Sequence, residues 1–248
     1  MTDPTLSLDR IYDLDTVIAQ RRDGYRFSVD ALLLSWFAYE HAPARVARTL
    51  ELGAGSGIIS ILLKRRGLNG IIDAVERQKS LFSLLARNIS HNHLEDTILP
   101  LLSDIRELCF PEARYDIVCF NPPYRAVDSG RAAPDKERAA ARHELFGSLD
   151  DFLRAGKQAL KKKGRLFFVY PAERLPFACA SAANQGLYPR QIALVSERPS
   201  DPPSLALFCC VTGDIRRSKL AISLIAMRES DGSESMIGTK VMHAPSRS

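Results

Sequence analysis

The middle of the chain alternates between short runs of apolar residues and longer stretches with helical periodicity. Residues 49–52, 71–75 and 98–102 are apolar runs with the length of a strand. Between them, residues 57–66 and 77–92 repeat apolar side chains every three or four positions, which is the spacing of an amphipathic helix. Strands that alternate with helices are typical of a parallel sheet with helices on both faces.

The same alternation continues toward the C-terminus. Further strands are expected at residues 115–120, 165–170, 191–195 and 205–211. The loop between the last two strands is too short for a crossover helix, so this pair should be antiparallel. A helix is expected at residues 149–160, ended by the cationic turn Lys161–Lys163 and by Gly164. Because Pro100 removes one backbone donor, the strand at 98–102 should lie at an edge of the sheet.

The pattern predicts one domain with two flanking regions. The chain has 248 residues, which is enough for one α/β domain and short for two. Residues 48–227 are expected to form the domain, and residues 1–47 an N-terminal extension packed on its core. Residues 228–248 are rich in serine, glycine and charge, so we expect them to be disordered.

Composition excludes several classes of protein. The five cysteines form no C-x-x-C pair and no His/Cys cluster has zinc spacing, so we expect reduced cysteines and no metal. The N-terminus lacks a secretory pattern, and the longest apolar stretch, residues 31–38, is too short to cross a bilayer. We therefore expect a cytoplasmic protein without a membrane or an obligate protein partner. The excess of 34 Lys and Arg over 29 Asp and Glu, a net charge of +5, permits a polyanionic partner without requiring one.

A glycine-rich turn follows the first expected strand, in the sequence Glu51-Leu-Gly-Ala-Gly-Ser-Gly57. Its G-x-G-x-G spacing differs from the G-x-G-x-x-G that seats a pyrophosphate on a helix N-terminus. Glu51 would repel a pyrophosphate and suits a ligand with an ammonium group, such as the amino-acid tail of S-adenosylmethionine. The alternative is a turn without a ligand. The candidate donor loop consists of Glu51, Gly53, Ala54, Gly55 and Gly57.

Two further acids end the next two strands. Glu76 follows the glycines by about 20 residues, where a carboxylate can accept hydrogen bonds from both hydroxyls of a ribose. Nicotinamide enzymes share this feature, and a solvated acid is its alternative. Asp104, after the third strand, can accept from the exocyclic amine of the donor's adenine. It can also cap a short helix at residues 105–108, and both roles can hold together.

The fourth strand ends in Asn121-Pro122-Pro123-Tyr124. The two prolines fix the backbone, so the Asn121 side-chain oxygen and the Pro122 carbonyl hold one geometry. These acceptors can take both hydrogens of a planar amino group and direct its lone pair toward an electrophile. Tyr124 offers a flat face on which a base can stack. A proline-rich turn with a surface tyrosine is the alternative.

These motifs together resemble the class I methyltransferases that modify amino groups of adenine, cytosine or glutamine. The segments Gly24-Tyr-Arg-Phe-Ser-Val-Asp30-Ala-Leu-Leu-Leu34 and Arg138…Arg142-His-Glu144 narrow the resemblance to the bacterial tRNA(Val) adenine-N6 methyltransferase family, over roughly residues 15–215. The resemblance implies a doubly wound, Rossmann-like α/β sheet of seven strands in the order 3-2-1-4-5-7-6, with the last strand antiparallel. It also implies S-adenosylmethionine as donor, S-adenosylhomocysteine as product and tRNA as partner.

The resemblance also assigns residues to roles. Residues 121–124 become the clamp for the target amine, and Glu51, Gly53, Gly55, Glu76 and Asp104 the donor site. Ala54, Gly57, Asn121 and Asp30 complete the candidate donor-binding set. Ser28 and Asp30 have an alternative as the N-cap and first-turn acid of a helix.

Cations follow the clamp directly and could touch phosphates of a nucleic acid. They are Arg125, Arg131, Lys136, Arg138 and Arg142, with Arg21, Arg22 and Arg26 from the N-terminal segment. A solvated loop is the alternative. His143 is interpreted as structural, and Lys161–Lys163 as the end of a helix rather than a nucleic-acid patch.

Three functions are compatible with these motifs. The favoured one is methyl transfer to the N6 amine of an adenine in tRNA, in the anticodon loop next to the anticodon. The second is methylation of a glutamine amide in a protein, or of another RNA or DNA amine, by the same clamp. The third is a dinucleotide-dependent oxidoreductase or an inactive cofactor-binding module. The G-x-G-x-G spacing and the clamp argue against the third.

Overall fold

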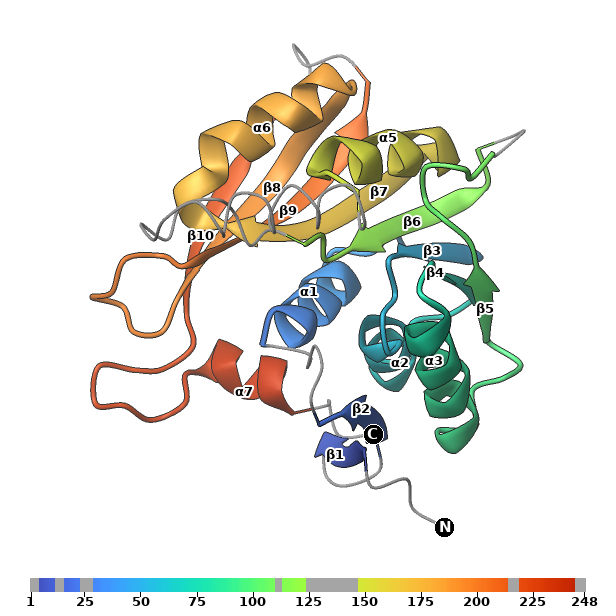
Figure 1. Ribbon diagram of the computed structural model, residues 1–248. Helices are drawn as coiled ribbons and strands as arrows, with labels where there is room; N and C mark the ends of the chain where they lie inside the picture. The colour runs from blue at the N-terminus through green and yellow to red at the C-terminus, as the bar shows by residue number, and fades with distance from the viewer. Residues whose placement is uncertain are drawn as a thin grey trace, which may run out of the picture.

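The computed structural model describes residues 5–11, 16–22, 29–109, 113–123, 147–213 and 219–243. A sheet of eight strands crosses the molecule, with α5 and α6 on one face and α1, α2 and α3 on the other (Figure 1). Its strands are β3 (Arg48–Leu52), β4 (Ile71–Glu76), β5 (Ile98–Leu102), β6 (Tyr115–Phe120), β7 (Leu160–Pro171), β8 (Leu187–Ser196), β9 (Leu205–Thr212) and β10 (Ala221–Ala226). The helices are α1 (Val29–Glu40), α2 (Ile58–Arg65), α3 (Lys79–His91), α5 (Leu149–Ala159), α6 (Leu175–Asn184) and α7 (Met236–Met242), with a 3₁₀ turn η1 at Ala172–Arg174.

The strands lie in the order β10-β8-β9-β7-β6-β3-β4-β5. Neighbours from β5 to β7 pair in parallel, whereas β9 runs antiparallel to both β7 and β8. The α/β class with helices on both faces is therefore confirmed, and β5, which contains Pro100, lies at an edge. The expected count of seven strands is wrong, because β10 adds an eighth strand parallel to β8.

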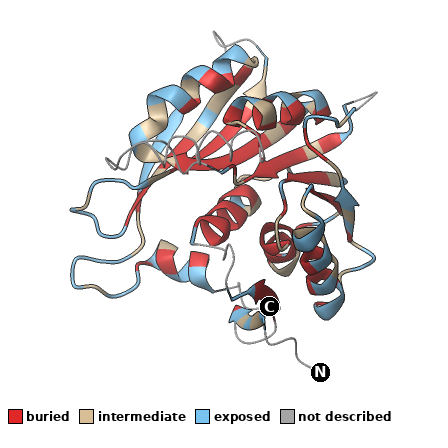
Figure 2. Cartoon of the chain, viewed as in Figure 1, coloured by how far each residue is buried: buried red, intermediate tan, exposed pale blue. Residues whose placement is uncertain are grey.

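The sheet divides the apolar core into two parts (Figure 2). On one face, Phe120, Phe168 and Phe208 form a row, with ring centroids 5.4 and 4.3 Å apart, beneath α5 and α6. On the other face, α1 packs against β7, β9, α2 and α7. Its residues 30–38 are all buried, which explains the apolar run at 31–38 as a helix surrounded by protein. Within the described residues, no helix is long and apolar enough to cross a membrane.

In the N-terminal extension, β1 (Leu6–Ile11) pairs antiparallel with β2 (Thr16–Arg21), and β2 packs against α3. The Asn88 side chain accepts from the Ala19 amide (2.8 Å) and donates to the Ala19 carbonyl (3.0 Å), as a neighbouring strand would. Asn92 makes the same pair of bonds with Val17, at 3.2 and 2.8 Å. Asn88 of α3 and Asn92, which caps the end of α3, thus bind β2 to the core.

The expectation of disorder for residues 228–248 is wrong for residues 228–243, and residues 244–248 lie outside the described part. The Ser235 hydroxyl caps α7 by accepting from the Gly238 amide at 2.9 Å. The Arg66 guanidinium donates to the carbonyls of Lys240 (2.9 Å) and Val241 (2.8 Å), and Val241 is fully buried. Contacts of α7 with Arg66 and with α1, both far away in sequence, are made by a segment whose composition alone predicts disorder.

The expectation for Lys161–Lys163 is also wrong. Helix α5 begins at a capping box between Ser148 and Asp151 and ends at Ala159. Strand β7 starts at the next residue, Leu160, and runs through the three lysines and Gly164. The lysines therefore belong to the first half of a strand, where the pairing of β7 with β6 shifts register between Leu160 and Arg165.

Candidate active site

The glycine-rich loop leaves β3 at the centre of the sheet, between β4 and β6. Gly53, Gly55 and Gly57 have φ angles of 68°, 58° and 85°, which other residues rarely adopt. A Cβ at Gly53 would lie 3.1 Å from the Phe152 ring, and one at Gly57 would lie 2.5 Å from Leu85. At Gly55 a Cβ would meet no atom within 4 Å. The first and third glycines therefore permit packing, and the second borders open space.

Glu51 lies in β3 and is buried. One carboxylate oxygen, Oε2, accepts from the Ser60 amide at 3.0 Å and from the Ser60 hydroxyl. The other oxygen, Oε1, is buried and has no hydrogen-bond partner among the described residues. Burial raises the pKa of Glu51 to about 7; the Ser60 bonds oppose this, and the charge of Glu76 adds to it. A buried acceptor without a donor is costly, so Oε1 favours a ligand that brings a cation or an N–H group.

Glu76, the last residue of β4, is held against the loop by backbone amides. Its Oε2 accepts from the Gly55 amide at 2.9 Å, and its Oε1 accepts from the Gln78 amide at 2.7 Å. The loop is also tied to β4 by the Ala54 amide, which donates to the Val75 carbonyl at 2.8 Å. Each carboxylate oxygen keeps a further lone pair for a hydroxyl group. The structure thus brings Glu76 and the glycine loop together, as expected.

Asp104 follows β5 and is held by two arginines. Its Oδ1 accepts from the amide and the Nε of Arg106, each at 3.0 Å. Its Oδ2 accepts from Arg106 Nη2 at 2.6 Å and from Arg77 Nε at 3.0 Å. The Arg106 hydrogen bond is the main cause that lowers the pKa of Asp104. The expected helix at 105–108 is a turn instead, and sequence reasoning missed both arginine partners, although each stands within two residues of a candidate acid.

Asn121 is the residue after β6 and lies beside the glycine-rich loop. Phe120 pairs with Leu52, so Asn121 and Gly53 follow neighbouring ends of two parallel strands. The half-buried Asn121 side chain makes no hydrogen bond within the described part of the chain, while Pro122 is buried and Pro123 exposed. Two acceptor positions therefore follow β6 at the edge of the sheet where the glycine loop lies.

Several candidate residues remain outside this geometry. Asp30 is buried in the first turn of α1, and its role toward a donor stays a prediction. Arg21 and Arg22 are exposed at the end of β2. The candidates that lie outside the described residues are Tyr124, Ser28, Arg26, Arg125, Arg131, Lys136, Arg138, Arg142 and His143. In the described ranges, no group of three His, Cys, Asp or Glu side chains is arranged to hold a metal ion.

A match to a family model shows the family to which the chain belongs. The model described as "Methyltransferase small domain" matches residues 29–177, from α1 to the start of α6. The chain belongs to this family. Its glycine loop, Glu76, Asp104 and residues 121–123 all lie within the matched region.

Related sequences carry a more specific name. The tRNA1(Val) (adenine(37)-N6)-methyltransferase of Parabacteroides distasonis is 30% identical over 184 residues, which cover 73% of this chain and 75% of the relative. The protein of the same name from Bacteroides fragilis is 29% identical over 211 residues, covering 83% and 86% of the two chains. The chain is an S-adenosylmethionine-dependent methyltransferase that resembles these proteins.

Solved structures show the same fold. A predicted O-methyltransferase from Agrobacterium tumefaciens superposes with a TM-score of 0.67 at 19% identity, covering 88% of this chain and 99% of that one. TYW2 from M. jannaschii, in complex with AdoMet, gives a TM-score of 0.56 at 14% identity, with 85% and 87% coverage.

The described residues fit the donor. S-adenosylmethionine carries an ammonium group, which suits the unpartnered Oε1 of Glu51. It carries a ribose, whose hydroxyls suit the two fixed oxygens of Glu76. Close approach to the loop needs the free space over Gly55.

Proposed function

We propose that this methyltransferase transfers a methyl group to the N6 amine of an adenine in tRNA. The relatives named tRNA1(Val) (adenine(37)-N6)-methyltransferase, which this chain matches over about three quarters of its length, carry the proposal. The position of Asn121 and Pro122 next to the donor loop supports it, because two acceptors are needed to hold a planar amine.

The clamp acts mainly by positioning and electrostatics. The Asn121 side-chain oxygen and the Pro122 carbonyl accept the two hydrogens of the amine and turn its lone pair toward the donor. S-adenosylmethionine supplies an electrophilic methyl group when bound. The amine nitrogen loses its proton after attack, so no strong base is needed beside it. Tyr124, outside the described residues, is proposed to stack on the adenine ring.

Three acids are proposed to form the donor site, and each is proposed to bind a different group of the donor. Glu51 binds the ammonium group, and Glu76 binds the ribose hydroxyls. Asp104 already receives four hydrogen bonds from Arg77 and Arg106, which use all the acceptor positions of a carboxylate. We therefore propose that it accepts the adenine amine of the donor only when one arginine moves away.

An adenine in a loop is the favoured acceptor. A base inside a helix hides its amine by stacking and pairing, and taking it out costs a few kcal/mol. That cost is smallest in a single-stranded loop, which favours the anticodon loop, next to the anticodon.

The deciding experiment offers the enzyme labelled donor with either tRNA or total cell protein. We expect label in tRNA, recovered as N6-methyladenosine after digestion and mass spectrometry. Label in a glutamine of a protein, with none in tRNA, would replace this proposal with the protein-amide alternative. A melting assay checks the donor separately, because S-adenosylhomocysteine should stabilise the protein and NAD should not.

A further inference from the structure

A cavity lies away from the glycine-rich loop, on the half of the sheet formed by β7, β9, β8 and β10. Its volume is about 360 Å³, and four of the eight described residues that line it are cations, with no acid among those eight. The cations are Lys163, Arg165, Arg190 and Lys219. Cys209 and Val211 of β9 form part of its lining. This is a concentration of positive charge that the proposed catalytic residues do not use.

The cavity opens on the α1 side of the sheet. Cys209 belongs to the same core cluster as α1, and Arg165 Nη1 donates to the carbonyl of His41, the residue after α1. Burial raises the pKa of the Cys209 thiol to about 12, and the positive charges of Arg165 and Arg190 oppose that rise. Both guanidiniums therefore lie close to the thiol that lines the cavity.

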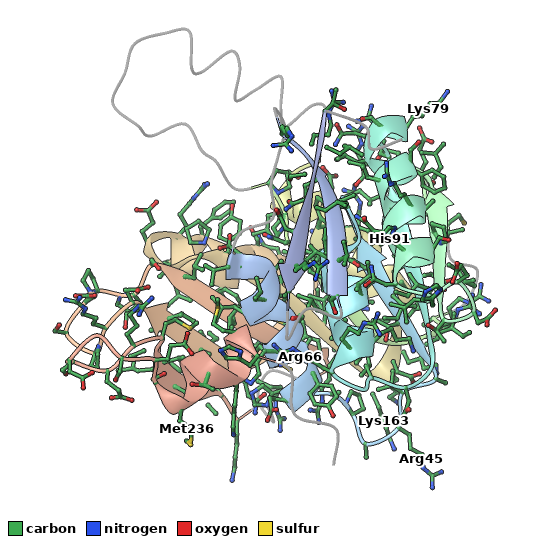
Figure 3. The ribbon with its side chains drawn as sticks, turned by 90° about the horizontal axis from the view of Figure 1, so that it is seen from below. Arg45, Arg66, Lys79, His91, Lys163 and Met236 are labelled. Atoms are coloured by element: carbon green, nitrogen blue, oxygen red, sulfur yellow. The ribbon has the colours of Figure 1, made fainter. Side chains whose placement is uncertain are left out.

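The register of the strands gives the distance to the target site. Phe168 pairs with Phe120, so Val169 is level with Asn121, and Arg165 lies four residues lower on β7. Four residues of strand and one strand spacing separate Arg165 from Asn121, which is roughly 13 Å along the strands and roughly 5 Å across them. The part of the cavity lined by β9 lies one spacing further away. Figure 3 shows Lys163 at the opposite end of the view from Lys79, which begins α3 at the donor edge.

The chemistry of the cavity favours a phosphate. Four cations in one cavity repel one another, and an anion that enters relieves this repulsion. The planar guanidinium of arginine matches the oxygens of a phosphate, and lysine adds a point charge. S-adenosylmethionine carries no phosphate, so the donor does not account for the cavity.

We propose that this cavity binds a backbone phosphate of the RNA acceptor, several nucleotides away from the methylated base. The inference rests on the proposed function, because an RNA is the acceptor with phosphates on both sides of the target. Phosphate contacts fix the register of a nucleic acid on a protein without reading its sequence. The cavity thus holds the RNA while the clamp holds one base.

The test compares two adjacent lysines of β7. Lys163→Gln removes a cation of the cavity, whereas Lys162→Gln removes its exposed neighbour, which does not line the cavity. Both variants lose one charge, so long-range attraction to RNA falls equally. Arg190→Gln is combined with Lys163→Gln as a stronger variant. Arg165 is left unchanged, because its bond to the His41 carbonyl also supports the fold.

The measurement is the dissociation constant for tRNA at several salt concentrations, with S-adenosylhomocysteine bound. For the double variant we expect roughly ten-fold weaker binding, and a logarithmic salt dependence shallower by about one unit for each phosphate that the variant no longer binds. Lys162→Gln should keep the salt dependence of the parent. The affinity for S-adenosylhomocysteine should stay the same in all variants.

Three other results would overturn the inference. Equal salt dependence in Lys163→Gln and Lys162→Gln would mean that no RNA phosphate enters the cavity. If inorganic phosphate raised the melting temperature of the parent but not of the double variant, with tRNA binding unchanged, the cavity would serve a free anion. If neither tRNA binding nor the melting shift with inorganic phosphate differed between the parent and the double variant, the cavity would not be a phosphate site. A parent enzyme that bound tRNA without methylating it would refute the proposed function, and the salt comparison would still decide this inference.

Discussion

The edge of the sheet that carries the candidate donor residues (the donor edge) and the cationic cavity hold their charges in opposite ways. At the donor edge, Glu51, Glu76 and Asp104 are buried, and amide, hydroxyl or guanidinium groups of the chain fix their positions. In the cavity, Lys163 and Lys219 are exposed and have no ion-pair partner within the described residues. Buried and hydrogen-bonded acids can select one small ligand by geometry. Exposed cations attract any phosphate and are screened by salt.

The largest expected effect concerns the clamp at the donor edge. Asn121→Ala removes one acceptor of the target amine and should lower the single-turnover rate by roughly 10²–10³-fold. The affinity for S-adenosylhomocysteine, measured by calorimetry, should change little. Asn184→Ala, at the exposed end of α6, is the matched control and should keep the parent rate. A rate for Asn121→Ala within a few-fold of the parent would show that the clamp assignment is wrong.

A variant that fills the open space over Gly55 tests whether the shape of the loop, rather than charge, determines donor binding. Gly55→Val would fill the open space with a branched side chain, so we expect donor affinity to fall by at least roughly 100-fold at any salt concentration. Gly186→Val is the control, because Gly186 also has a positive φ of 70° but lies at the end of α6. It should lose stability and still show the melting shift with S-adenosylhomocysteine. Normal donor binding by Gly55→Val would contradict the position of the donor.

The pH dependence of donor binding tests the buried acid. The pKa of Glu51 is raised from 4.5 to about 7, so between these values the folded protein holds a proton that the unfolded chain has lost. The contribution of Glu51 to stability therefore falls as pH rises through this window and is constant above it. An ammonium ligand binds the ionised form, so donor affinity should rise by up to about ten-fold per pH unit until about pH 7.

Calorimetry with S-adenosylhomocysteine between about pH 6 and 8 measures this rise. Glu51→Gln should bind more weakly and lose the pH dependence, because its side chain does not ionise. Glu173→Gln, an exposed change in η1, should retain it. A flat profile in the parent would exclude Glu51 as the partner of the ammonium group.

The smallest effect distinguishes two lysines at the basic end of the sheet. Lys161 is paired with Asp116 at 2.7 Å, and Asp116 also accepts from the amides of Ala47 and Arg48. Lys161→Gln should cost about 0.5 kcal/mol or less in urea unfolding, because the pair is partly exposed. The salt dependence of tRNA binding should match the parent. A change as large as that of Lys163→Gln would mean that pairing does not set the two lysines apart.

The elements that sequence reasoning could predict are those with local signals. The glycines after an apolar run predict the turn that follows β3, and Pro100 predicts that β5 lies at an edge. The acids Glu51, Glu76 and Asp104 were found because carboxyl ends of parallel strands meet at one edge, although their roles toward a ligand stay predictions.

The features that sequence reasoning missed depend on contacts between distant segments. Ser60 becomes the partner of Glu51 only when α2 packs on β3. Strand β10 exists because β8 offers an edge, and α7 is ordered because Arg66 binds its last carbonyls. Lysines at 161–163 are equally compatible with the end of a helix or the start of a strand. In this chain β7 begins at Leu160, paired with Tyr115 of β6.

The position of β9 has a consequence for synthesis of the chain on the ribosome. Strand β9 lies between β7 and β8, although both neighbours precede it in sequence. Until residues 205–212 have emerged, the buried residues 166–170 of β7 have an unpaired backbone edge on the side away from β6. An apolar strand with an open edge is a site of aggregation, and domains generally fold as units once they emerge. Translation that stops before Leu205 would therefore leave an insoluble product, whereas a stop after residue 212 would leave β7 covered.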